Sequence, residues 1–110
     1  MTDTKTFPMS EVRKIIGDEA QKQFGAMTGV KYELRTTTFT VETEEESYWE
    51  RAKVDIVLET DIYGEEVSGY YINYSSRWQS AEFASRMSVL IGGVSSIAKK
   101  LEVAGLTCAK

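Results

Sequence analysis

The spacing of apolar residues changes twice along this chain, and the two changes divide it into three parts. Across residues 8–27 apolar side chains recur every three or four positions, as in an amphipathic helix. Across residues 31–74 the repeat is two, which is typical of half-buried strands. Across residues 77–103 the helical spacing returns. The pattern predicts an α+β fold with helices at both ends and strands between them.

Two of the predicted strands form a hairpin. Val54, Ile56, Leu58 and Ile62 alternate with polar residues in one, and the other contains Tyr70, Ile72 and Tyr74. Residues 63–67 suit a short loop between them. Pairing Tyr63 with Val67 then places Leu58 opposite Ile72 and Ile56 opposite Tyr74. This register brings the apolar residues to one face.

The remaining strand, residues 31–43, has an inconsistent parity. Tyr32 and Leu34 occupy even positions, whereas Phe39 and Val41 occupy odd ones. Either a bulge near residues 36–38 returns Phe39 and Val41 to the core, or they face away from it. We favour the register without a bulge, which pairs Leu34 with Thr60 and Arg35 with Glu59 across a turn at residues 46–48.

The expected architecture is a single α+β domain over residues 1–110 with the order α-β-β-β-α. Its strands form a three-stranded antiparallel meander, and both helices pack on one face. Thr6 or Ser10 would cap the first helix, while a capping box at residues 76–79 would start the second and Gly105 would end it. Gly92 and Gly93 inside the second helix predict a bend or a close crossing with another helix.

Composition excludes several kinds of chemistry. The chain has no histidine and one cysteine, so it contains neither a Ser/His/Asp nor a Cys/His catalytic set. A structural zinc site would need more Cys or His ligands. Asp55, Glu59 and Asp61 alternate onto the wet face of a strand, where acid–base catalysis is not expected. We expect no enzymatic activity, no cofactor, no metal and no membrane span, and a cytoplasmic protein with Cys108 reduced.

The net charge of −4 is unevenly distributed. Residues 30–76 contain four basic and eleven acidic residues, a net charge of −7, whereas residues 77–110 contain five basic and two acidic residues, a net charge of +3. An acidic central segment repels a nucleic-acid backbone and attracts basic proteins. The expected partner is therefore a protein with a basic surface.

An acidic run beside an aromatic residue is the first candidate site, formed by Glu42, Glu44, Glu45, Glu46 and Trp49. It would grip a basic protein, with Trp49 as an apolar anchor. A calcium loop is disfavoured because the run lacks the usual glycine and alternate ligand spacing. The simpler alternative is a solvated turn with Trp49 folded back onto the core.

Two further surfaces are candidates for association. Phe39, Val57 and Tyr71 would lie on the outer face of the sheet as an apolar patch, unless a bulge buries Phe39. The wide apolar stripe of the last helix would either pack inside the chain or bind a second copy to give a homodimer. Its residues around the two glycines are Met87, Leu90, Ile91, Gly92, Gly93 and Val94.

These observations favour a small acidic, non-catalytic protein-binding module. Regulators, inhibitors and chaperones fit this description, including inhibitors encoded by phages or mobile elements, and the sequence does not select among them. The alternative is a nucleic-acid-binding domain, because the α-β-β-β-α order is also that of double-stranded RNA-binding domains. Those domains place basic residues at the start of the last helix, where this chain has Arg77 but also Glu82.

Overall fold

The computed structural model describes residues 6–44, 50–77 and 80–108. The fold is α+β, as expected, but the described part contains five strands where the sequence predicted three. The elements in chain order are β1 (Phe7–Pro8), α1 (Met9–Phe24), β2 (Val30–Leu34), β3 (Thr38–Thr43), β4 (Arg51–Thr60), β5 (Glu66–Arg77) and α2 (Ala81–Ala104).

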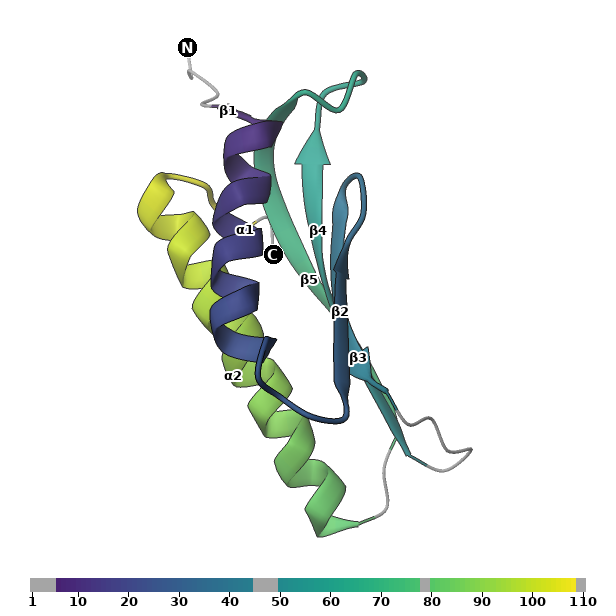
Figure 1. The fold of residues 1–110 in the computed structure, drawn as a ribbon. Helices are drawn as coiled ribbons and strands as arrows, with labels where there is room; N and C mark the ends of the chain where they lie inside the picture. The colour runs from purple at the N-terminus through teal and green to yellow at the C-terminus, as the bar shows by residue number, and fades with distance from the viewer. Residues whose placement is uncertain (1–5, 45–49, 78–79, 109–110) are drawn as a thin grey trace.

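The strands form one curled antiparallel sheet in the order β1-β5-β4-β3-β2. Both helices lie against the same face of this sheet, as predicted, and no helix of the described chain covers the other face (Figure 1). The domain is elongated, with principal extents of 50 × 25 × 23 Å. The sheet therefore has a helix face, which carries the core, and an open face.

The segment predicted as one strand over residues 31–43 is two strands, β2 and β3, separated by a turn at residues 35–37. The turn is closed by a hydrogen bond from the Arg35 N–H to the Thr38 carbonyl, and Arg13 of α1 donates to the Arg35 carbonyl. Because the chain reverses there, the even positions of β2 and the odd positions of β3 point to the same face. Phe39 and Val41 are consequently buried, so the register without a bulge was wrong.

The pairing of β3 with β4 differs accordingly from the expected one. Phe39 lies opposite Ile56 and Thr38 opposite Val57, so the predicted pair of Arg35 and Glu59 does not form. Arg35 instead lies in the turn, with its Nε 3.4 Å from the Glu33 carboxylate.

The β4–β5 hairpin is confirmed, but its register is displaced by two residues from the predicted one. Leu58 lies opposite Tyr70 and not opposite Ile72, and a register shift follows between Glu59 and Thr60. A displacement of two preserves the side-chain faces. Strand β4 ends at Thr60 and β5 begins at Glu66, however, so Ile62 lies in the turn and outside the strand.

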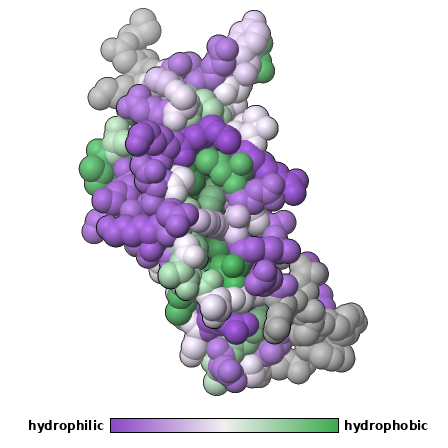
Figure 2. Space-filling view, in the orientation of Figure 1, coloured by the Kyte–Doolittle hydropathy of each residue, from purple (hydrophilic) through white to green (hydrophobic). Residues whose placement is uncertain are grey.

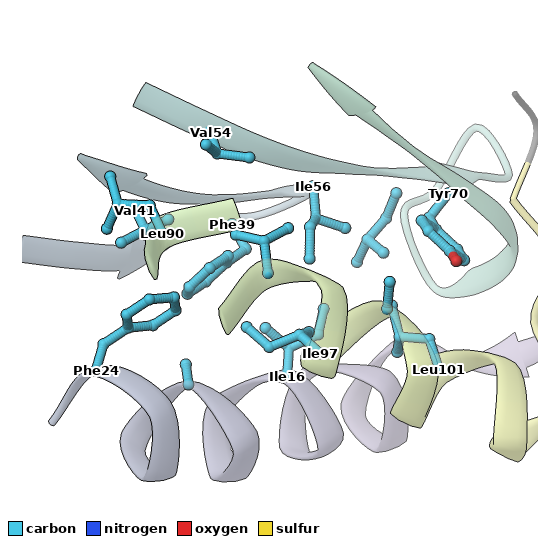
Figure 3. Packing of buried hydrophobic residues seen from close by; sticks show 14 of the residues in the cluster. Ile16, Phe24, Phe39, Val41, Val54, Ile56, Tyr70, Leu90, Ile97 and Leu101 are labelled. Atoms are coloured by element: carbon cyan, nitrogen blue, oxygen red, sulfur yellow. The ribbon is translucent and has the colours of Figure 1, made fainter. Parts of the chain in front are cut away.

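The core fills the space between the helices and the helix face (Figure 3). Three rings link α1 to the sheet, with Phe24 stacked on Phe39 at 6.4 Å and Tyr32 edge-on to both at 6.1 Å. Gly93 of α2 lies directly against the Phe24 ring. The predicted close helix crossing is therefore present, and α2 runs through it without interruption.

The helix ends agree only in part with the predicted caps. Ser80 caps α2, accepting a 3.1 Å hydrogen bond from the Phe83 N–H, whereas Ser76 belongs to β5. The predicted capping box at residues 76–79 was therefore misplaced. Gly105 ends α2 in the left-handed conformation, as predicted. Pro8 stands at the N-cap of α1 without a side-chain cap, so neither Thr6 nor Ser10 fills that role.

The two adjacent glycines of α2 give opposite predictions for replacement by alanine. A Cβ at Gly92 meets no atom within 4 Å, so Gly92→Ala should stabilise the fold by about 1 kcal/mol through helix propensity alone. A Cβ at Gly93 collides with the Phe24 ring, so Gly93→Ala should destabilise it by about 1–3 kcal/mol. Urea unfolding measures the free energy of unfolding of both variants. Changes of the same sign would contradict the close crossing of the two helices at Gly93.

Candidate functional site

The apolar stripe predicted for self-association is largely occupied within the chain. Met87, Leu90, Gly93 and Val94 are buried, as the intramolecular alternative required. Only Gly92 is exposed, and Ile91 is half-buried. The stripe of α2 therefore serves the core, and its remaining surface is narrow.

The open face of the sheet retains a small part of the predicted apolar patch. Val57 and Tyr71 lie directly opposite each other on this face and are half-buried. Phe39 is absent from it because that side chain lies in the core, 2% exposed. The predicted patch is therefore reduced to one cross-strand pair.

Charges of both signs surround that pair on the open face. Glu42 lies opposite Lys53 on adjacent strands, and Asp55 accepts a 2.7 Å hydrogen bond from the Thr40 hydroxyl. A shallow hollow of about 310 Å³ lies here, and its lining comprises Glu33, Arg35, Thr38, Thr40, Glu42, Lys53 and Asp55. Because basic and acidic groups alternate, this hollow does not select strongly for either sign of ligand charge.

The predicted acidic run is described only in part. Glu42 lies on the open face, and Glu44 is exposed directly after β3, where its N–H donates to the Gly29 carbonyl. Glu45, Glu46 and Trp49 lie outside the described residues. The expected anchoring by Trp49 stays a prediction from the sequence.

Sequence reasoning predicted a loop between β4 and β5 but did not identify it as a candidate site. Residues 61–66, which we name the hairpin tip, project at one end of the molecule (Figure 1). Ile62 is 90% exposed and Tyr63 is 77% exposed. Asp61, Glu65 and Glu66 flank them, and the tip contains no basic residue. The alternation with β4 hid this site because it assigned Ile62 to a strand.

The hairpin tip is held by its own hydrogen bonds. The Asp61 carboxylate accepts from the N–H groups of Glu65 and Glu66, at 2.9 and 3.4 Å. The Asp61 carbonyl accepts from the Gly64 N–H at 3.1 Å. Gly64 has a φ of 69°, a left-handed conformation that glycine adopts without strain. These contacts fix the backbone that presents the two apolar side chains.

Two further contacts tie the hairpin tip to the start of α1. The Met9 N–H donates to the Glu65 carbonyl at 2.7 Å, and the Thr6 hydroxyl donates to the Glu66 carboxylate at 2.9 Å. The tip is thus anchored on both sides, through its own turn and through the N-terminal segment.

On the face shown in Figure 2, hydrophobic surface is divided into small areas. In the view of Figure 2, patches of hydrophobic colour lie in a strip between the helices and the sheet, surrounded by hydrophilic residues. A shallow pocket in the same region is lined by Gly17, Ala20, Tyr32, Glu33, Leu34 and Phe39. Phe39 and Ala20 are core residues, so this pocket is the margin of the core.

The N-terminus of α2 already contains a carboxylate. Glu50 accepts hydrogen bonds from the Ser80 N–H at 3.0 Å and the Ser80 hydroxyl at 2.6 Å. Helix N-termini favour anions, and here the chain supplies one. The adjoining pocket is lined by Glu50, Ser80, Glu82, Phe83 and Arg86.

Among the described residues, no group of three or more metal-ligating side chains lies together. Within the same ranges, no helix combines the length and the apolar character that crossing a membrane requires. Cys108 is a free, exposed thiol.

Comparison with known proteins returned no relative. No protein-family model, no curated protein and no solved structure matches the chain.

The hydrogen bonds at Asp61 predict how acid affects the hairpin tip. The Glu65 N–H, and secondarily other backbone N–H groups of the turn, hold the pKa of Asp61 below its ordinary value. The ionised carboxylate therefore stabilises the fold fully at pH values above the pKa that Asp61 has in the unfolded chain. This stabilisation is lost as the pH falls through the lower pKa that Asp61 has in the folded chain. Asp61→Ala should cost stability at neutral pH, and the cost should shrink below about pH 4.

Urea unfolding at several pH values measures this difference. The control is Asp18→Ala, which removes another exposed carboxylate, one on α1 that lies 3.3 Å from the Lys14 ammonium. A cost for Asp61→Ala that stays constant as the pH falls would show that the ionised carboxylate does not hold the turn.

Proposed function

We propose that this chain is a non-catalytic protein-binding module whose partner has a basic surface. The observation that carries the proposal is the hairpin tip, where Ile62 and Tyr63 stand exposed on a fixed turn among acidic residues. A module of this kind acts as a regulator, inhibitor or chaperone of its partner.

The apolar part of the hairpin tip supplies binding free energy. Burying a large apolar side chain contributes about 1.5–3 kcal/mol, and tyrosine is enriched among the residues that dominate protein interfaces. The turn is already ordered by the hydrogen bonds of Asp61 and by the contact of Glu65 with Met9. Because little conformational freedom remains to be lost, more of the contact energy is available for affinity.

The charged part of the hairpin tip selects the partner. Asp61, Glu65 and Glu66 surround the apolar pair with negative charge, and Glu59 precedes them in β4. Such a rim accelerates encounter with basic proteins and disfavours acidic ones. The partner surface that fits is an apolar depression bordered by lysine or arginine.

The hairpin tip can be tested by replacing its two apolar side chains. Ile62→Ser combined with Tyr63→Ser leaves every hydrogen bond of the turn backbone in place and should lower the affinity for the partner at least tenfold. Val103→Ser is the matched control, because Val103 is also apolar and 80% exposed but lies near the end of α2. Affinity capture of proteins from the host's lysate, followed by titration of the captured protein, provides the measurement.

Two results would contradict this proposal. One is a partner that binds the Ile62→Ser, Tyr63→Ser variant as tightly as it binds the unaltered chain. The other is recovery of RNA at physiological salt in place of a protein, which would favour the nucleic-acid alternative. The carboxylate of Glu50 at the start of α2 argues against that alternative, because it fills the place a phosphate would take.

The acidic rim has a separate test. Glu65→Lys changes an exposed side chain whose backbone alone makes the contacts of the turn. It should slow association and weaken its dependence on salt, whereas Glu82→Lys, the same change at an exposed position at the start of α2, at the other end of the molecule, should have little effect (Figure 1). Stopped-flow or surface-plasmon measurements over a salt series distinguish the two. Equal effects of both variants on the association rate would mean that this rate depends on the net charge of the chain and not on the hairpin tip.

A further inference from the structure

Strand β5 has an open edge. Its first residues are covered, since Phe7 pairs with Val67, and Cys108 bridges to Tyr70. The C-terminal end of the described chain accordingly lies beside β5 in Figure 1. From Ile72 to Arg77, however, no strand of the described chain pairs with the side of β5 that faces away from β4. Residues 72–77 are named the open edge below.

The backbone groups that reach the open edge can be identified. The Tyr70 N–H donates to the Thr107 carbonyl, away from β4. Backbone direction alternates along a strand, so the N–H and C=O groups of Ile72, Tyr74 and Ser76 point the same way. The side chains of these residues lie on the helix face, where Tyr74 is 54% exposed.

The open edge lacks the features by which proteins prevent strands from pairing. Exposed edges usually carry lysine, proline or a bulge, whereas the open edge contains neither lysine nor proline, and its one charged residue is Arg77 at its end. The register shift of β5 lies at the other end of the strand. At the opposite edge of the sheet, β2 is shorter and carries exposed Lys31 and Glu33.

We propose that the open edge pairs with the same edge of a second copy of this chain, forming one continuous antiparallel sheet across a two-fold axis at Tyr74. Each Ile72 then lies opposite Ser76 of the second copy, and the two Tyr74 residues lie opposite each other. The outward backbone groups exchange about six hydrogen bonds. The pairing closes on itself, since both copies use the same edge.

The side chains of the open edge are complementary in this register. On the open face, Tyr71 meets Arg77 of the second copy, a favourable contact of a cation with an aromatic ring. Asn73 meets Ser75 of the second copy, and both are polar and uncharged. No pair in this register places like charges opposite each other, a contact that would destabilise the pairing. This self-complementarity selects a second copy over an unrelated strand.

Helix α2 approaches β5 near the covered end of the strand. The Tyr70 hydroxyl donates to Glu102 at 2.9 Å, so that side of α2 lies next to β5. Ile91 occupies the same side of the helix about three turns earlier. Both Ile91 and Ile72 are only half-buried against the core. An added strand would cover Ile72, and its own Ile72 and Tyr74 side chains would lie on the helix face.

The mass of the chain in solution tests the pairing. Light scattering coupled to gel filtration should show a dimer of the 12.4 kDa chain that dissociates on dilution. Tyr74→Lys places two positive charges on the two-fold axis and should give a monomer at every concentration. Tyr63→Lys is the matched control, since Tyr63 is at least as exposed but lies in the hairpin tip, and it should stay dimeric.

Cross-linking tests the register. In a Cys108→Ser background, an equimolar mixture of Asn73→Cys and Ser75→Cys chains should form a disulfide-linked dimer in higher yield than either chain alone. Should Tyr74→Lys fail to give the circular dichroism of a folded protein, Ser76→Lys at an exposed edge position repeats the test, again with a monomer expected. A monomeric unaltered chain, a dimer that survives the folded edge variant, or equal cross-linking yields would each overturn the proposal.

Discussion

The contact of the Phe24 ring with the backbone of Gly93 sets the distance between the two helices, and the rest of the fold depends on it. Only a glycine allows α2 to approach this ring so closely. The same ring stacks on Phe39 and meets the edge of Tyr32, so the helix pair and strands β2 and β3 share one cluster. Neighbouring buried residues extend this cluster along the helix face (Figure 3).

In this arrangement one face of the sheet is buried in the core. Binding of a partner or of a second copy must therefore use the remaining surface. The apolar stripe of α2 is used inside the chain, from Phe83 to Leu101. The large apolar side chains that stay exposed in the described chain lie at the hairpin tip (Ile62 and Tyr63), at the open edge (Tyr74) and on the outer side of α2 (Val89 and Val103). The two proposals use different ends of β5, so a dimer formed through the open edge would still present two hairpin tips.

Sequence periodicity predicted the helices and the helix face because both depend on patterns that extend over many residues. It failed where short features decide the structure. The turn at residues 35–37 is Arg-Thr-Thr, without glycine or proline, so nothing in the pattern separates β2 from β3, and Phe39 was assigned to the wrong face. The β4–β5 register depends on the irregularity between Glu59 and Thr60, which alternation does not reveal. The loop between these strands was predicted, but alternation extended β4 to Ile62 and so hid the exposed pair at the hairpin tip.

The central claim is that the helix face of the sheet is filled by the core and the other face is open. Phe39 and Tyr71 test it most directly, because the sequence predicted both on the outer face whereas the structure places Phe39 on the helix face. Phe39→Ala should lower the free energy of unfolding by about 3–5 kcal/mol, since that ring is fully enclosed in the core. Tyr71→Ala on the open face should lower it by about 1 kcal/mol. Urea unfolding of the two variants gives both values. A small loss for Phe39→Ala, similar to that for Tyr71→Ala, would place both rings on the open face and contradict this account.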